Sequence, residues 1–117
     1  MPRVLLVEDD ADIRVIFEHV LLEAGYEVDA TETIEGGNEL LSHRPYHVVV
    51  TDGRLPDGIG LTLADRAREK GIPSLIVTGY AFVLRELGAD PKKYRVLLKP
   101  IRPSEILQAV ADALGAP

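Results

Sequence analysis

The chain has 117 residues, enough for one domain around one hydrophobic core. Its formal net charge of −6 argues against a nucleic-acid-binding surface, and the absence of cysteine excludes disulfides, thiolate zinc sites and thiol nucleophiles. No signal peptide precedes the first apolar segment and no apolar run approaches the ~18 residues of a membrane span. We therefore expect a cytoplasmic protein that binds neither nucleic acid nor membrane.

Two apolar segments open the chain. Residues 4–7 predict a short buried strand, and apolar side chains at helical spacing predict a helix over residues 13–21 that Gly25 ends. Between the two segments, four of five residues are carboxylates, which is more than capping of the helix needs. The predicted apolar face of this helix consists of Ile13, Ile16, Phe17, Val20 and Leu21.

Two weaker elements follow. The alternating segment Glu27–Thr31 predicts an edge strand, and residues 33–43 predict a modest helix with Ile34, Leu40 and Leu41 on its apolar face. Gly36 and Gly37 are expected to weaken this helix by about 1 kcal/mol each.

The middle of the chain holds a run of three valines. Residues 48–50 predict a strand buried on both faces, and Asp52 stands at its end. Residues 56–58 (Pro-Asp-Gly) predict a plain turn. A helix over residues 60–70, with Leu61, Ala64 and Ala67 facing inward, leads to a buried strand at residues 74–77, which Thr78 follows.

The last third is less regular. Residues 81–87 could form two helical turns that Gly88–Pro91 stop, because the residue before a proline avoids helical angles. Residues 94–98 predict the last strand, which Lys99 follows. Pro103 at a first helical position begins the final helix. Its apolar face consists of Ile106, Leu107, Val110 and Leu114.

Buried strands therefore alternate with amphipathic helices along the whole chain. This alternation predicts one α/β domain over residues 1–117, with a five-stranded parallel sheet and helices on both faces. The flavodoxin-like strand order 2-1-3-4-5 is the leading candidate.

In that order the first and third strands are neighbours, which brings three carboxylates together. Glu8, Asp9 and Asp52 would repel one another unless a cation lies among them, and oxygen ligands alone favour Mg²⁺, with Mn²⁺ as an alternative. Thr78 and Lys99 add a hydroxyl and an ammonium group to the same edge. Such a set suits phosphoryl transfer with Asp52 as the nucleophile, although a role for Asp52 as a loop cap stays open on that residue alone.

Taken in order, these residues resemble the receiver domain of two-component response regulators, over the whole chain. The motifs that carry the resemblance are Val7-Glu8-Asp9, Asp52, Thr78-Gly79 and Lys99-Pro100. The Thr78–Ala81 run and residues 97–101 look like receivers of hybrid histidine kinases and stand-alone receivers of α-proteobacteria.

The resemblance implies a role for each matching residue. Asp52 would accept a phosphoryl group from a histidine kinase or a phosphotransfer protein, and the domain would catalyse only its own phosphorylation and dephosphorylation. It would then signal to a downstream protein by a conformational change, or act as a phosphate sink. Metal ligands would be Glu8, Asp9, Asp52 and the backbone carbonyl of Arg54, and phosphate contacts would be Thr78, the Gly79 backbone and Lys99. The Lys99–Pro100 peptide bond would be cis.

The sequence departs from the family at a position that changes conformation on phosphorylation in many receivers. Many receivers have an aromatic residue three positions before the lysine, where this chain has Val96. We therefore expect Tyr80 to Lys93, directly after Thr78, to be the segment that phosphorylation changes. The Arg54 side chain could be solvated or could lean over the phosphate, and the first is slightly favoured.

Other functions fit the sequence less well. A metal-dependent phosphohydrolase would need a second acid two residues after Asp52, where Arg54 stands, and a flavin or nucleotide binder would need a less acidic first loop. An excised receiver of a hybrid kinase also fits, although Met1 argues mildly against it. The scattered histidines, which have no metal-ligand spacing, are expected to be surface residues: His19, His43 and His47.

Overall fold

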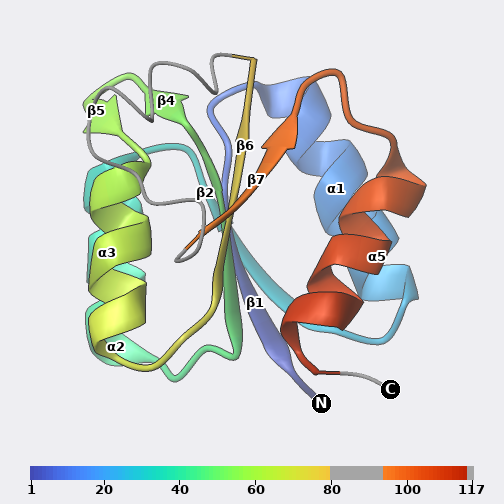
Figure 1. The fold of residues 1–117 in the computed structure, drawn as a ribbon, viewed down its shortest axis with the longest axis horizontal. Coiled ribbons are helices and arrows are strands. Elements are labelled where there is room, and N and C mark those ends of the chain that lie inside the picture. Colours follow the sequence, from blue (N-terminus) through green and yellow to red (C-terminus); the bar gives the residue numbers. More distant parts are fainter. Residues whose placement is uncertain (80–93, 116–117) are drawn as a thin grey trace.

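The computed structural model, which describes residues 1–79 and 94–115, contains the predicted five-stranded parallel sheet (Figure 1). The strand order is β2-β1-β3-β6-β7, which is the predicted order 2-1-3-4-5 in chain numbering. The sheet strands are β1 (Arg3–Val7), β2 (Glu27–Thr31), β3 (Val48–Asp52), β6 (Ser74–Thr78) and β7 (Arg95–Leu98). The described helices are α1 (Ala11–Glu23), α2 (Ile34–His43), α3 (Leu61–Glu69) and α5 (Pro103–Ala113). The helical turns expected in residues 81–87 lie outside the described residues.

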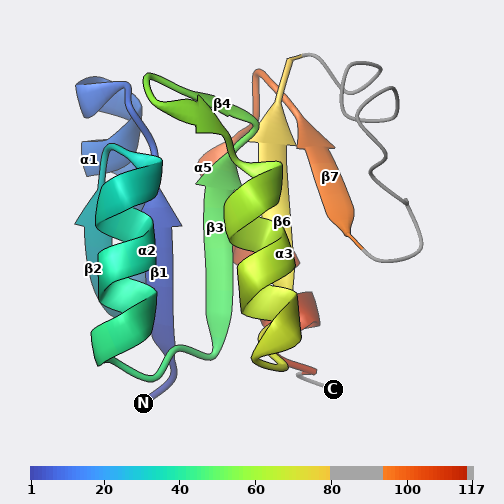
Figure 2. The same ribbon diagram turned by 90° about the vertical axis from the view of Figure 1, so that its left-hand side faces the viewer.

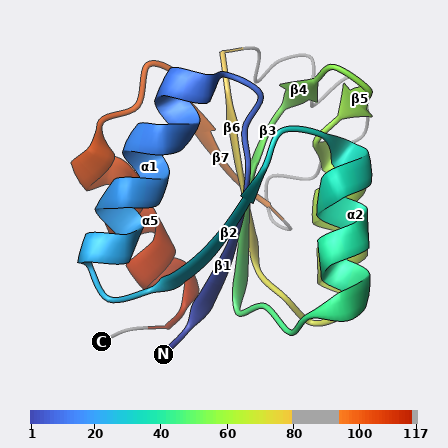
Figure 3. The same cartoon turned by 180° about the vertical axis from the view of Figure 1, so that it is seen from behind.

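Helices cover both faces of the sheet. Figures 1 and 3 show α1 and α5 on one face and α2 and α3 on the other. The three valines of β3 alternate between the faces, with Val48 and Val50 packed beneath α1 and α5 and Val49 packed beneath α2 and α3. All three are almost completely buried, which is why this strand is a continuous apolar run.

Parallel strands place all their carboxyl ends at one edge of the sheet. Figure 2 shows β1, β3, β6 and β7 pointing toward the edge where β4 lies. The chain begins at the opposite edge, where α5 also ends. No helix in the described part of the chain is long and apolar enough to cross a membrane.

Helix α1 begins and ends close to the predicted positions. Asp10 caps its first turn, because the Asp10 Oδ1 atom accepts hydrogen bonds from the backbone N–H groups of Asp12 and Ile13. Phe17 and Leu21 are buried as predicted, but Ile16 is 49% exposed, so its assignment to the inward face was wrong. The helix carries more apolar side chains than the sheet can cover.

The glycines of α2 have a role that propensity alone does not show. A β-carbon on Gly37 would lie 3.0 Å from both terminal carbons of Leu63 in α3 and 3.3 Å from Val7 in β1. Glycine at this position therefore permits close packing of α2 against α3 and the sheet. The expected weakening of α2 by its glycines stays a prediction.

The turn at residues 56–58 belongs to a hairpin that contacts α2. Strands β4 (Arg54–Leu55) and β5 (Gly58–Ile59) form an antiparallel hairpin, and Asp57 accepts two hydrogen bonds from the start of α2. The prediction of a plain turn missed this contact, because a partner 23 residues away leaves no local signal in the sequence.

Two of the three histidines form polar contacts at the surface, as expected for solvated side chains. The Nε2 atom of His19 lies 3.3 Å from the Oε1 atom of Glu23, and the Nδ1 atom of His47 accepts a hydrogen bond of 3.0 Å from the Arg3 backbone N–H. All three histidines are exposed.

We predict that Gly60→Ala strongly destabilises the fold. A β-carbon on Gly60 would overlap the backbone carbonyl oxygen of Asp52, which cannot move without displacing strand β3. We expect a loss of about 2–4 kcal/mol in the free energy of unfolding, as for overpacking against rigid backbone. Urea denaturation measures this loss, with Gly79→Ala as the control, because no atom of the described residues lies within 4 Å of a β-carbon added to Gly79. Equal stability of the two variants would contradict the prediction.

Candidate functional site

Four strands bring the predicted site residues together at the carboxyl edge of the sheet. Glu8 follows β1, Asp52 ends β3, Thr78 ends β6 and Lys99 follows β7. The register places Asp52 beside Val77 and Thr78 beside Leu98 in neighbouring strands. The convergence predicted from the strand order is confirmed.

Three carboxylates form the centre of this edge. One oxygen each of Glu8, Asp9 and Asp52 lies within 4.8 Å of the others. Glu8 and Asp52 are buried, with 3% and 6% of their surface exposed, whereas Asp9 is open to solvent. A set of carboxylate oxygens that is closed on one side and open on the other suits a hard divalent cation that keeps some of its waters.

Lys99 supplies a positive charge directly beside these carboxylates. Its Nζ atom lies 2.6 Å from Asp52 Oδ1 and 3.3 Å from Glu8 Oε1. The second oxygen of Glu8 accepts a hydrogen bond of 3.0 Å from the Asp10 backbone N–H, so both oxygens of this buried carboxylate have partners. One ammonium group offsets only part of the charge of three carboxylates.

The pKa values of the cluster reflect this imbalance. Burial, together with Glu8 and Asp9, raises the pKa of Asp52 to about 8, although the Lys99 ammonium acts in the opposite direction. Burial works against ionisation of Asp9 as well, but hydrogen bonds with Asp52 and Glu8 lower the Asp9 pKa. Partial burial opposes the charged form of Lys99, yet the bond to Asp52 and the negative charge nearby raise the Lys99 pKa. A further cation among the carboxylates would relieve the penalty on Asp52.

A cavity of about 360 Å³ opens over Asp52. Its lining residues come from the four loops at this edge: Asp9, Asp52, Arg54, Leu55, Pro56, Thr78, Gly79 and Lys99. The predicted phosphate contacts Thr78, Gly79 and Lys99 thus share one cavity with the predicted nucleophile. Arg54 also lies in its wall and is exposed, so whether its side chain is solvated or leans over the site stays a prediction.

Two glycines hold the loop after Asp52 in place, and sequence reasoning missed both. Gly53 donates its backbone N–H to the Val77 carbonyl at 3.0 Å, and a β-carbon on Gly53 would lie 2.7 Å from the Thr78 side chain. Gly60 donates to the Gly53 carbonyl at 2.9 Å and closes the loop. These glycines resemble ordinary turn residues in the sequence, because the contacts that require them come from neighbouring strands.

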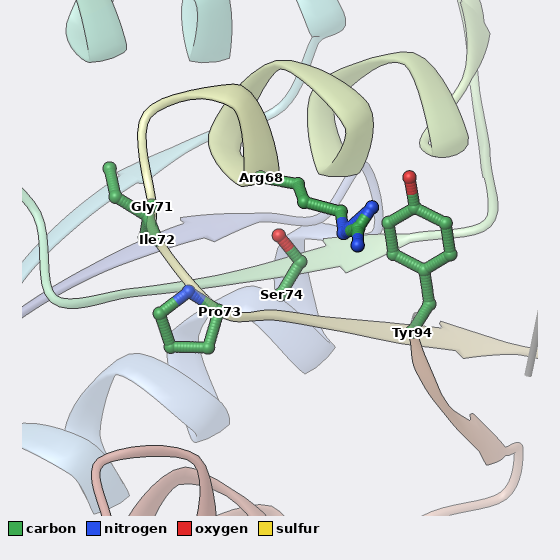
Figure 4. A pocket seen from close by; sticks show the side chains of 6 residues that line it. All are labelled: Arg68, Gly71, Ile72, Pro73, Ser74 and Tyr94. Atoms are coloured by element: carbon green, nitrogen blue, oxygen red, sulfur yellow. The ribbon is translucent and has the colours of Figure 1, made fainter. Parts of the chain in front are cut away.

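Two other cavities differ in character from the first. One of about 490 Å³ lies between α1 and the loop before α5, and it is largely apolar: Ile13, Ile16, Phe17, Lys99, Pro100, Ile101 and Pro103. The other, of about 320 Å³, lies near the amino ends of β6 and β7 (Figure 4), where the Ser74 hydroxyl is buried and has no hydrogen-bond partner among the described residues. Its described lining contains no carboxylate, so its chemistry differs from that of the acidic cavity at the opposite edge of the sheet.

The Lys99–Pro100 peptide bond is cis, as the resemblance implied. Pro100 lies in the wall of the apolar cavity and Lys99 in the walls of both this cavity and the acidic one. The two cavities are therefore adjacent, with the lysine between them.

We predict that Lys99→Met destabilises the protein in the absence of divalent cations. Removal of the ammonium group leaves Asp52 and Glu8 facing each other in a buried site. We expect a loss of about 2 kcal/mol at a pH above the Asp52 pKa of about 8, less than the ~3–5 kcal/mol of a fully buried pair, because 29% of the Lys99 side chain is exposed. Thermal or urea unfolding in a chelator measures this loss, with the exposed Lys70→Met as a matched control. An equal effect of both substitutions would contradict the assignment.

Comparisons with known proteins agree with this geometry. The family model of the response regulator receiver domain matches residues 4–111. The response regulator receiver protein CpdR of Brucella abortus is 32% identical over 119 residues, which cover 99% of each chain. The response regulator protein PilR of Pseudomonas aeruginosa is 30% identical over 96% of this chain, but the match spans only 26% of PilR.

A solved structure shows the same architecture. The response regulator protein TrrA of Thermotoga maritima, determined in complex with Mg²⁺ and BeF, superposes with a TM-score of 0.84 at 26% sequence identity. The match covers 97% of this chain and all of TrrA. With its sheet, its acidic edge and its relatives in agreement, this chain belongs to the response regulator receiver domain family, a family of signalling modules of two-component systems.

Proposed function

We propose that this domain takes a phosphoryl group onto Asp52 from a phosphohistidine of a sensor histidine kinase or a phosphotransfer protein. The observation that carries the proposal is the 2.6 Å contact between Lys99 Nζ and Asp52 Oδ1 inside a cluster of three carboxylates. Family membership supports it, since receiver domains act in two-component signalling.

The transfer step uses groups that lie around Asp52. A carboxylate oxygen of Asp52 attacks phosphorus, a new O–P bond forms, and the P–N bond to the donor histidine breaks. The Lys99 ammonium, released from its contact with Asp52, offsets negative charge on the phosphoryl oxygens, and Thr78 and the Gly79 backbone line the same cavity. Hydrolysis of the aspartyl-phosphate by water would reset the site, so the domain turns over only its own phosphoryl group.

A divalent cation fits the residues of this edge. Glu8, Asp9, Asp52 and the backbone carbonyl of Arg54 would hold Mg²⁺, or Mn²⁺ in its place. The fit rests on the three convergent carboxylates and on the raised pKa of Asp52, which marks negative charge that Lys99 alone does not offset. When bound, the cation would neutralise the charge of the carboxylates and of the incoming phosphoryl oxygens.

The apolar cavity beside the site suits the docking of a phosphodonor protein. Lys99 lies in the walls of both cavities, so a protein bound over Ile13, Ile16 and Ile101 would have its reactive group close to Asp52. Ile13 and Ile16 of α1 lie in the wall of this cavity, and Ile16 is 49% exposed. A partner helix with an apolar stripe would bury them.

The output of the domain would be a conformational change read by a downstream protein, or removal of phosphoryl groups from the kinase. Val96 is half-buried on β7 and packs beside Leu61, Ala64 and Ile76, so no ring rotates at this position. The segment expected to change, residues 80–93, lies outside the described residues. That expectation stays a prediction.

The proposal is tested by incubation with a small phosphodonor and Mg²⁺, followed by intact mass measurement. We expect a gain of one acid-labile phosphoryl group that requires the metal. Steady release of phosphate from many unrelated phosphate esters, without a mass gain, would instead favour a phosphohydrolase. No mass gain and no phosphate release would overturn the proposal.

A further inference from the structure

The hairpin that follows Asp52 is tied to a helix that is distant in sequence. The two carboxylate oxygens of Asp57 accept hydrogen bonds from the backbone N–H groups of Ile34, at 2.9 Å, and Glu35, at 3.0 Å. These bonds lower the pKa of Asp57, so the carboxylate is ionised at neutral pH. A negative charge at the amino end of α2 is also favoured by the helix dipole.

The same hairpin forms one wall of the acidic cavity. Its first strand holds Arg54, whose backbone carbonyl is a proposed metal ligand, and Arg54 pairs with Ile59 of the second strand. The base of the loop is fixed to the sheet through the Gly53 and Gly60 backbone bonds described above. Asp57, near the tip, fixes the other end of the loop to α2.

Apolar packing strengthens this second attachment. Leu55 of the hairpin and Ile34 of α2 are both buried in the core cluster beneath α2 and α3. The Cδ1 atom of Ile34 also lies so close to Gly58 that a β-carbon there would approach it to 2.9 Å. The hairpin and the first turn of α2 are therefore joined by both hydrogen bonds and apolar contacts.

We propose that Asp57 is a positioning residue for the metal site, which holds the hairpin so that the Arg54 carbonyl faces the carboxylates. This inference rests on the proposed function. Because coupling between two sites is reciprocal, occupation of the metal site should in turn tighten the first turn of α2. The amino end of α2 thus becomes a second region that responds to the state of the phosphorylation site.

The chain offers a matched control for a purely structural effect. Thr33 caps the same helix end, since its Oγ1 atom accepts a hydrogen bond of 3.0 Å from the Gly36 backbone N–H. Thr33 belongs to the connection from β2, and this bond joins that connection to α2 without involving the hairpin. Loss of either cap should weaken α2 to a similar extent, but only loss of Asp57 should release the loop.

The experiment compares Mg²⁺ affinity by calorimetric titration in the full chain. We expect Asp57→Ala to raise the Mg²⁺ dissociation constant about fivefold, at the lower end of coupling between sites, and Thr33→Ala to leave it unchanged. Asp57→Asn, which keeps one acceptor oxygen instead of two, should give an intermediate value. An equal effect of Asp57→Ala and Thr33→Ala, or no effect of either, would overturn the inference.

Amide hydrogen exchange gives a second readout. In the wild-type protein, Mg²⁺ should slow exchange at the Ile34 and Glu35 N–H groups by a factor similar to the change in affinity, and this slowing should vanish in Asp57→Ala. Exchange rates at these two amides that do not change when Mg²⁺ is added would also overturn the inference. Failure of the wild-type protein to bind Mg²⁺ at all would instead overturn the metal part of the proposed function.

Discussion

Asp52→Asn should abolish phosphoryl uptake. The amide keeps the shape of the carboxylate but lacks the nucleophilic anion, and no other carboxylate in the described part of the chain lies as close to Lys99. We expect uptake from a small phosphodonor to fall by at least a factor of about 100, as for removal of a nucleophile. Intact mass and acid lability of the product provide the measurement.

The control for this substitution is Asp10→Asn. Asp10 lies two residues from Glu8 but caps α1, and asparagine caps a helix about as well as aspartate. Phosphorylation of Asp10→Asn should therefore stay close to that of the wild type. Uptake by Asp52→Asn at the wild-type rate would show that another residue is the acceptor.

The substitution Asp52→Asn should also remove a pH-dependent loss of stability. The pKa of Asp52 is raised from 3.8 to about 8 in the folded, metal-free protein. Between these two values the folded state holds a proton that the unfolded chain has released, so stability falls as the pH rises through this window. The slope is at most about 1.4 kcal/mol per pH unit.

Unfolding by urea at several pH values, in the presence of a chelator, tests whether stability falls as the pH rises. The stability of the wild type relative to Asp52→Asn should decrease from about pH 4 to about pH 8, and it should level off above that range. Addition of Mg²⁺ at pH 8 should restore stability in the wild type, by about 2.7 kcal/mol at a concentration 100 times the dissociation constant, and by less in Asp52→Asn. A difference in stability between the wild type and Asp52→Asn that changes with neither pH nor Mg²⁺ would contradict the raised pKa of Asp52.

The sheet and the acidic centre could be predicted from the sequence because their signals are local. Alternation of short apolar runs with helical periodicity indicates parallel strands, and Asp52 and Lys99 each follow such a run directly. Once the strand order is known, geometry alone places their side chains at one edge. The cavity around Asp52 confirms that reasoning.

The features that could not be predicted depend on contacts between distant segments. Asp57 has the sequence of an ordinary turn, and its partners in α2 become visible only when the hairpin folds over that helix. Gly37 looks unfavourable for a helix until Leu63 is placed against it. Ile16 fits a helical apolar stripe, yet the sheet covers only part of that stripe, and the remainder is exposed.

The common direction of the parallel strands has a practical consequence for experiments on this protein. The chain begins at the edge opposite the acidic cavity, where Met1 is 79% exposed, and α5 ends at that edge as well. Strand β1, which is five residues long, spans roughly 17 Å between this edge and Glu8. A chain anchored to a biosensor surface through its first residue would therefore present Asp52 and its cavity to the solution, on the side away from the support, where the proposed phosphodonor protein would bind.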